Sequence, residues 1–179
     1  MIYFTSDIHF GHTNIIRSCS RPFENADEMD EAIIRNWNGK VKPEDEVYIL
    51  GDVTMKGPDF AKERLLRLNG TLYLVKGNHD HFVNKNKFEP SLFEWVKDYY
   101  QLKVDNQRFI LFHYPITEWN YRSQGSIHLH GHQHNRPEYN LKNRENGILQ
   151  YDVGMDANHF TPVSLEEIVQ FFGVRCDTK

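Results

Sequence analysis

The sequence contains few cysteines and lacks both an excess of basic charge and any long apolar run. Among its 179 residues only Cys19 and Cys176 are cysteines, and they lie far apart in the chain. Two thiols without a disulfide framework are typical of a reducing compartment rather than of a secreted, disulfide-stapled domain. No apolar stretch approaches the roughly 18 residues that a membrane-spanning helix needs. The sequence therefore argues against a secreted scaffold and against a membrane span.

The charge balance also limits the partners. The net charge is −4 and the sequence pI is about 6.2, whereas domains that bind nucleic acid over an extended surface are normally basic. Any phosphate recognition must therefore be local. The chain enters an apolar run at Ile2 and so shows no charged and apolar leader segment. We expect a cytoplasmic protein with one domain over residues 1–179, without repeats or linkers.

Several apolar runs end in aspartate, histidine or asparagine. The run and the polar residues that follow it are Ile2–Ser6 with Asp7-Ile8-His9, Val47–Leu50 with Gly51-Asp52, Thr71–Val75 with Gly77-Asn78-His79-Asp80, Phe109–Phe112 with His113, and Ser126–His130 with Gly131-His132-Gln133-His134. Runs of this length bounded by Gly and Asn are typical of buried strands that end in tight loops. In α/β sheets, ligands bind at the carboxyl ends of strands. One such residue is usually a turn or cap residue, but the repetition predicts a shared site.

The donor types indicate what this site binds. Carboxylates, imidazoles and an amide, with no thiolate among them, suit divalent ions such as Mn²⁺, Fe²⁺, Zn²⁺ or Ni²⁺. The five motifs, in this order and spacing, resemble those of the calcineurin-like metallophosphoesterases from Met1 to about Gly154. That resemblance implies a four-layer αββα sandwich, in which two mixed β-sheets are flanked by helices and the metal site lies at the sheet edge.

The periodicity of the chain points the same way. Strands alternate with helices in the first half, and strands dominate afterwards, as expected for two packed sheets with helices outside. Besides the strands above, the pattern predicts a hairpin of Tyr99–Val104 and Arg108–Phe112, and a strand over Ile148–Val153. The predicted helices are Thr13–Ser18, Ala26–Trp37 ended by Asn38-Gly39, Asp59–Leu68, a short one over Leu92–Val96, and one opened by Thr161–Ser164 with a Ser164–Glu167 capping box.

The resemblance also implies roles for the strand-end residues. Asp52 would bridge two metal ions, with Asp7, His9 and His134 completing the first and Asn78, His113 and His132 completing the second. His79 would be a catalytic residue that binds no metal, and Asp80 could orient its ring. The predicted reaction is hydrolysis of a phosphoester by a hydroxide that two divalent ions, Mn²⁺ by preference, activate.

Other residues allow two interpretations each. His12 is either a loop cap or a substrate contact. His128 and His130 are either core residues or supports of the ligands. Asp152 and Asp156 either orient ligand imidazoles or cap loops. The loop arginines are phosphate clamps or solvated charges, and the sequence places them at Arg17, Arg21, Arg122 and Arg136. Tyr114 and Trp119 are a wall for a base or part of the core.

The substrate class is narrowed by two departures within the motifs. Val53 follows Asp52, and Asp80 follows His79, whereas protein phosphatases of the resembled family carry Asp-Arg-Gly and Asn-His-Glu. A small phosphorylated substrate, such as a nucleotide or cyclic nucleotide, is therefore expected rather than a phosphoprotein. Two rival interpretations are a catalytically inactive scaffold of the same fold and a nuclease subunit. The scaffold would be expected to have lost ligands, and the nuclease to carry a basic surface.

Overall fold

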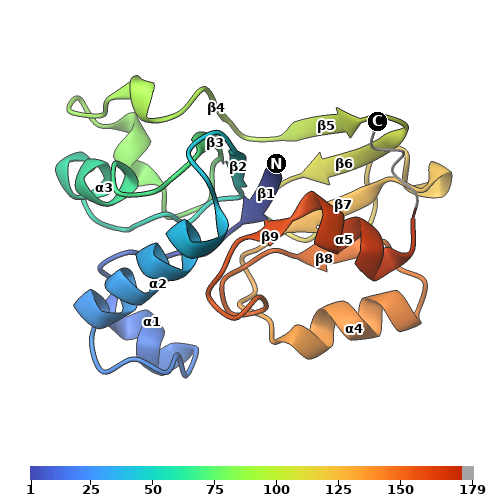
Figure 1. The fold of residues 1–179 in the computed structure, drawn as a ribbon, viewed down its shortest axis with the longest axis horizontal. Coiled ribbons are helices and arrows are strands. Elements are labelled where there is room, and N and C mark those ends of the chain that lie inside the picture. The colour runs from blue at the N-terminus through green and yellow to red at the C-terminus, as the bar shows by residue number, and fades with distance from the viewer. Residues whose placement is uncertain (175–179) are drawn as a thin grey trace.

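Two mixed β-sheets lie face to face in the computed structural model, which describes residues 1–174 (Figure 1). The first sheet has the order β4-β3-β2-β1-β9, with β1 Ile2–Thr5, β2 Glu46–Ile49, β3 Thr71–Val75, β4 Val96–Lys97 and β9 Val163–Ser164. The second has the order β5-β6-β7-β8, with β5 Tyr100–Val104, β6 Gln107–Leu111, β7 Ile127–His130 and β8 Gln150–Asp152. The predicted two-sheet α/β fold is confirmed.

Alternating side chains divide the core into two layers. On β1, Tyr3 joins the cluster between the first sheet and its helices, and Phe4 joins the cluster between the two sheets. On β2, Val47 and Tyr48 divide in the same way. Successive residues of a strand point to opposite faces, so a strand that is apolar on both faces must be covered twice.

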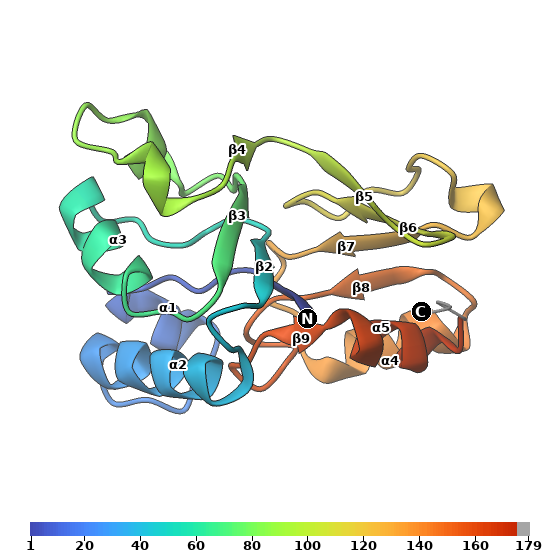
Figure 2. The same ribbon diagram turned by 45° about the horizontal axis from the view of Figure 1, so that its top comes forward.

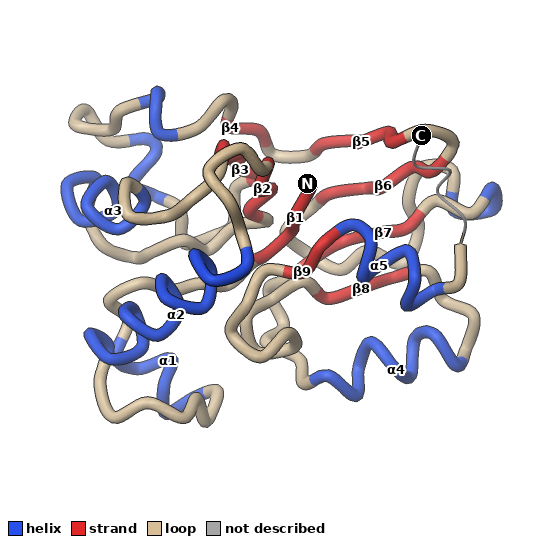
Figure 3. The backbone as a smooth tube through the Cα atoms, viewed as in Figure 1, coloured by secondary structure: helices blue, strands red, loops and turns tan. Residues whose placement is uncertain are grey.

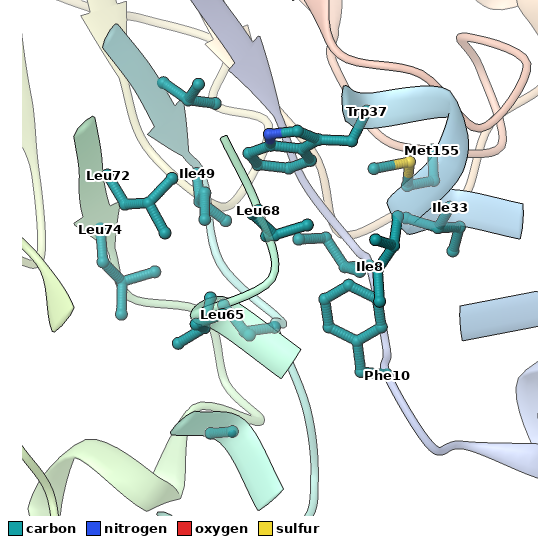
Figure 4. Close-up of a cluster of buried hydrophobic side chains, with 14 of the residues drawn as sticks. Ile8, Phe10, Ile33, Trp37, Ile49, Leu65, Leu68, Leu72, Leu74 and Met155 are labelled. Carbon is teal, nitrogen blue, oxygen red and sulfur yellow. The ribbon is translucent and has the colours of Figure 1, made fainter. Parts of the chain in front are cut away.

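Three helices cover the outer face of the first sheet, and they gather on the left of Figure 1. They are α1 Thr13–Ser18, α2 Ala26–Lys40 and α3 Pro58–Leu65. Figure 4 shows Trp37 and Ile33 of α2 and Leu65 of α3 in one cluster with the strand residues Ile49 and Leu74. The indole Nε1 of Trp37 donates to the carbonyl of Asn69 at 2.9 Å, so its polar atom is also satisfied.

Two further helices accompany the second sheet (Figure 2). In α5, Leu165–Phe172, the predicted Ser164–Glu167 capping box is present, and Leu165 and Ile168 enter the core between the sheets. The other helix, α4, Pro137–Glu145, was not predicted because its buried residues are asparagines rather than an apolar stripe. Its Asn140 pairs with the edge strand β8, since it donates to Asp152 O at 3.0 Å and accepts from Asp152 N at 2.7 Å.

Two predicted helix ends and one predicted short helix were wrong. Helix α2 does not stop at Asn38-Gly39 but continues to Lys40, because the Asn38 side chain bonds to Arg67 O and Asn69 N instead of capping the helix. Helix α3 ends at Leu65. The predicted helix over Leu92–Val96 is replaced by a 3₁₀ turn, Pro90–Leu92, followed by β4. The hairpin of β5 and β6 is confirmed.

The loops that follow the strands meet at one edge of the molecule. Strands β1, β2 and β3 are parallel, as are β6, β7 and β8, so the carboxyl ends of each set share an edge. The two sheets are joined there by a bridge between Ser6 and Gly154. Figure 3 shows these connections as tan segments without regular structure. Within residues 1–174 no helix has the length and apolar character to cross a bilayer.

Candidate metal centre

The loops at this edge hold their polar residues in left-handed backbone conformations. The φ angles are 56° at Asp7 and His9, 58° at Asp52, 72° at His132 and 50° at His134. Residues other than glycine rarely adopt positive φ, because the Cβ atom then crowds the backbone. Such conformations persist only where the surrounding structure enforces them, and they concentrate at functional sites.

Glycines next to these residues allow the loops to approach one another closely. A Cβ atom on Gly131 would overlap Ser6 Oγ and Asp7 Oδ2, and one on Gly77 would overlap Asp52 Oδ1. At Gly51, where φ is +92°, a Cβ atom would lie 2.6 Å from the His113 Nδ1 atom. These contacts leave no room for a side chain, so the glycines of the Gly-Asp, Gly-Asn and Gly-His pairs are required by packing.

Asp7, His9 and His134 form a first cluster, whose candidate ligand atoms lie within 4.8 Å of one another. Asp7 Oδ2 accepts from Ser6 Oγ at 2.6 Å and from the His132 backbone N at 2.8 Å. Asp7 Oδ1 is buried without a hydrogen-bond partner, as are both ring nitrogens of His9. Buried polar atoms are almost always paired, so unpaired atoms that face one another indicate a ligand site.

Asp52, His113 and His132 form a second cluster beside the first. His113 Nδ1 lies 2.7 Å from Leu50 O, and its Nε2 lies 3.0 Å from Asn78 Oδ1. Because a carbonyl can only accept, Nδ1 carries the proton in the neutral ring, and Nε2 presents a lone pair to another acceptor. Two acceptors that face each other in this way are typical of ligands that share a cation.

Asp52 connects the two clusters. Its Oδ1 accepts from the His79 backbone N at 2.9 Å, whereas its Oδ2 lies 3.6 Å from His9 Nε2 in one cluster and 3.6 Å from His113 Nε2 in the other. One carboxylate oxygen therefore faces both sets of donors. Oxygen and imidazole donors arranged around a shared carboxylate fit a pair of divalent ions.

Burial sets the protonation of the first cluster. It raises the pKa of Asp7 to about 6 and lowers the pKa of His9 to about 2, so the His9 imidazole is neutral and offers lone pairs. Burial also lowers the pKa of His134, but its 2.9 Å bond to Asp156, together with Cys19 and the charge of Asp7, outweighs that effect and raises the pKa to about 10. A cation at His134 Nε2 would compete with a proton there, while the Nδ1–H bond to Asp156 would stay in place.

A family model described as calcineurin-like phosphoesterase matches residues 1–105, which is more than half of the chain. The chain is a calcineurin-like phosphoesterase. This membership supports a metal-dependent phosphoesterase, an enzyme of the hydrolase class.

Relatives of this phosphoesterase cover nearly the whole chain. The uncharacterized protein MJ1445 of Methanocaldococcus jannaschii is 35% identical over 173 residues, which cover 94% of this chain and 89% of that protein. The Gene 66 protein of Mycobacterium phage D29 is 31% identical, with 88% and 89% covered. The crystal structure of AQ665 from Aquifex aeolicus, a protein of unknown function, matches with a TM-score of 0.73 and 31% identity over 95% and 98% of the two chains.

The fold of this phosphoesterase brings all seven predicted ligands into one site: Asp7, His9, Asp52, Asn78, His113, His132 and His134. Their roles as ligands of two ions stay a prediction. The predicted catalytic His79 lies beside them, with its ring centroid 5.6 Å from that of His9.

The orienting role predicted for Asp80 does not match its contacts. Its carboxylate accepts from the backbone N–H groups of Asp52 at 2.9 Å, Val53 at 2.8 Å and Gly77 at 2.8 Å. Asp80 is 3% exposed and its oxygens are occupied by these donors, so it holds the β2 and β3 loops together rather than turning the His79 ring. The sequence could not distinguish the two roles because Asp80 adjoins His79 in the chain.

The loop arginines are placed differently from phosphate clamps. Arg21 is buried, pairs with Asp156 at 2.8 Å, and donates to the carbonyls of Asp7 and Ile8 at 2.7 and 3.0 Å. It therefore supports the loop that carries Asp7 and His9. Arg122 pairs with Glu118 on the surface, Arg136 donates to Cys19 O, and Arg17 is exposed.

Of the two aromatic residues after His113, only Tyr114 is at the site. It is 36% exposed and its ring lies 4.6 Å from that of His132. Trp119 instead donates to Ser126 O and packs on His128. It therefore covers the outer face of β7. His128 and His130 are fully buried there, and they are core residues.

Three residues support the loops of the site. The sequence predicts Ser6 only as a strand residue, but its hydroxyl bonds both to Asp7 and to Leu50 O, the latter at 2.9 Å. Of the aspartates with two readings, Asp156 contacts His134, and Asp152 bonds to Gly154 N and the Asn135 side chain. The only early signal for Ser6 was its place just before Asp7. Cys176 lies outside the described residues.

Proposed function

We propose that this phosphoesterase hydrolyses phosphodiesters or phosphomonoesters of small substrates, nucleotides among them, with two divalent ions held by the seven clustered residues. The observation that carries this proposal is the position of Asp52 Oδ2, 3.6 Å from a histidine of each cluster. The preference for Mn²⁺ rests on the oxygen-and-imidazole donor set.

Two bound ions would supply positive charge for the phosphoryl oxygens and an ionised water at neutral pH. The side chains of the site supply the rest. Hydrolysis joins the oxygen of water to phosphorus, breaks the bond to the leaving oxygen, and gives that oxygen a proton. We assign that proton transfer to His79, which regains a proton released from the water.

The contacts of His79 support this role. Its backbone N–H donates to Asp52 Oδ1, whereas Oδ2 is the oxygen near His9 and His113, and this bond holds the His79 backbone beside the clusters. The ring then lies next to the clusters, and within residues 1–174 it belongs to neither of the two groups of candidate ligands. A group held close to the reacting atoms, and free to exchange a proton, is what an acid–base residue needs.

The test is turnover by metal-reconstituted protein on bis(p-nitrophenyl) phosphate, p-nitrophenyl phosphate, and a panel of 2′,3′- and 3′,5′-cyclic nucleotides. We expect turnover that depends on Mn²⁺, is lost with chelator, and is greater for diesters. Asp52→Asn should remove both activity and bound metal. Full activity of that variant would contradict the proposed metal site around Asp52. No turnover by the wild-type protein with any of Mn²⁺, Fe²⁺, Zn²⁺ or Ni²⁺ would contradict the proposed reaction and favour a non-catalytic scaffold.

A further inference from the structure

A cavity of about 320 Å³ opens beside the metal centre, and none of the candidate ligands lines it. Its walls are formed by the loop from Phe10 to Asn14 and by Met55 and Lys56. Small-molecule sites begin at about 300 Å³, so the cavity is large enough for a substituent of a substrate.

Hydrogen bonds fix both loops that form this cavity. Buried Asp30 accepts from Gly11 N at 2.9 Å and is itself held by Arg64 Nε at 2.9 Å. The Thr54 hydroxyl donates to Phe10 O at 2.8 Å and accepts from Lys56 N at 3.0 Å, which ties the second loop to the first. The cavity is therefore preformed rather than a gap between mobile segments.

His12 lines this cavity, and one of its ring nitrogens has no hydrogen-bond partner among the described residues. It occupies the N-cap position of α1, but its side chain makes no capping hydrogen bond. The interpretation of His12 as a cap is therefore wrong. Its Nδ1 is buried without a partner, and its ring lies 5.4 Å from that of His9. The ring of His79 also lies 5.6 Å from that of His9, so His12 and His79 are neighbours of the same imidazole.

Lys56 contributes a positive charge to the same cavity. Within residues 1–174 it has no ion pair, whereas Lys40, Lys62 and Lys76 each contact a carboxylate. Its stem passes over the first loop, since Cε lies 3.4 Å from the position of a Cβ atom on Gly11. An unpaired ammonium and an unsatisfied imidazole at one cavity are complementary to an anion.

We propose that this cavity binds the leaving group of the ester, and that the leaving group carries a second anionic group bound by Lys56 and His12. The assignment rests on the proposed function, because it is the position of His79, the acid for the leaving oxygen, that puts the cavity on the leaving side. A carboxylate and a phosphate share the required chemistry. A nucleotide released as the leaving group would satisfy it.

The experiment compares three methyl aryl phosphodiesters that differ in one substituent of the leaving phenol: 3-hydroxybenzamide, 3-hydroxybenzoate and 3-hydroxyphenylphosphonate. The amide and the carboxylate have nearly the same shape but differ in charge. For the wild-type enzyme with Mn²⁺ we expect kcat/KM to be about fivefold or more higher for the anionic esters, mainly through KM. A larger preference for the phosphonate than for the carboxylate would identify phosphate as the natural group.

Variants test whether Lys56 causes the preference. Lys56→Met keeps the stem over Gly11 and should bring the ratio of anionic to neutral kcat/KM close to one, and Lys56→Arg should restore it. Lys42→Met is the matched control, because Lys42 is exposed near the amino end of β2, at the opposite edge of the sheet. The ratio of anionic to neutral kcat/KM for Lys42→Met should equal that of the wild type. Bound metal is measured in every variant.

The outcomes separate the two proposals. If the wild-type enzyme cleaves none of the three esters with any ion, the proposed function fails. If it cleaves all three with equal kcat/KM, or if Lys56→Met lowers kcat/KM equally for all of them, the phosphoesterase assignment stands and the role of the cavity is overturned.

Discussion

The two carboxylate oxygens of Asp52 have different partners. Oδ1 is occupied by the His79 backbone N–H, which leaves Oδ2 for the histidines of both clusters. The two ring nitrogens of His113 also have different partners, because Nδ1 is bonded to Leu50 O and Nε2 faces Asn78. Backbone groups thus decide which atom of each side chain is available to a cation.

His79→Ala should lower turnover by at least about 100-fold while bound metal stays nearly unchanged, because the variant removes a proton donor and no ligand. Turnover on bis(p-nitrophenyl) phosphate and metal content of the purified protein are the measurements. His159→Ala, at an exposed position, should match the wild type. Loss of both ions from His79→Ala would instead make His79 a ligand.

Gly131→Ala should damage the first cluster by steric overlap. The new Cβ atom would overlap Ser6 Oγ and Asp7 Oδ2, which are already fixed by hydrogen bonds. We expect a loss of about 2 kcal/mol in the free energy of unfolding by urea, together with weaker metal binding. Gly57→Ala is the control, because nothing lies within 4 Å of a Cβ atom there. Wild-type stability and metal affinity in Gly131→Ala would refute the packing argument.

At the scale of elements, the site depends on contacts between loops rather than on any one strand. Asp80 joins the loop after β2 to the loop after β3, and Arg21 joins the loop after β1 to Asp156 beyond β8. Both connectors are buried ionisable groups: Asp80 accepts from backbone N–H groups, and Arg21 donates to backbone carbonyls and pairs with Asp156. Such groups position the ligands without touching the reacting atoms.

Asp80→Asn should therefore act on stability first. An amide group in place of the carboxylate turns one acceptor into a donor that faces backbone N–H groups, which should cost about 3 kcal/mol in the free energy of unfolding. Urea unfolding of the metal-free protein is the measurement. Asp98→Asn is a surface control, since the Asp98 side chain is 81% exposed and, within residues 1–174, forms an ion pair only with Lys76. Unchanged stability with lost turnover would favour the original orienting role of Asp80.

At the scale of the whole molecule, the outer face of the second sheet carries buried histidines that are not part of the site. His128 and His130 are fully buried, and burial lowers the pKa of each to about 4. The pKa of each histidine is lower in the folded state than its unfolded value of about 6.5, so the unfolded state binds a proton more readily. The stabilisation is complete above pH 6.5 and is lost as the pH falls toward 4.

His128→Gln should therefore reduce the loss of stability on acidification. When the pH falls from 7.5 to 5, the wild-type His128 should lower the free energy of unfolding by about 2 kcal/mol, and the variant should lack this loss. Asp7, Asp80 and Asp152, whose pKa values burial raises to about 6, act in the opposite direction but are common to both proteins. Urea unfolding with chelator at the two pH values measures the difference. An equal pH dependence in the two proteins would mean that folding does not lower the pKa of His128.

Much of the site could be predicted because its information is local. Asp7, Asp52 and Asn78 each follow an apolar strand, and parallel strands bring their carboxyl ends to a common edge. The glycines before Asp52 and Asn78 could also be read from the sequence, although the overlaps that require them could not. Helix α4 escaped prediction because it is anchored by Asn140, a polar residue that gives no apolar periodicity.

The sequence by itself determined the donor residues, their order along the chain and the strands that end in them, because these depend on residue type and on short-range periodicity. Only the tertiary structure decided that Asp80 and Arg21 support loops, that Trp119 covers β7, and that His12 and Lys56 share a cavity. Those roles depend on partners distant in the chain, such as Arg21 and Asp156, which are separated by 135 positions. No local pattern encodes which distant group a side chain will meet when the sheets pack together.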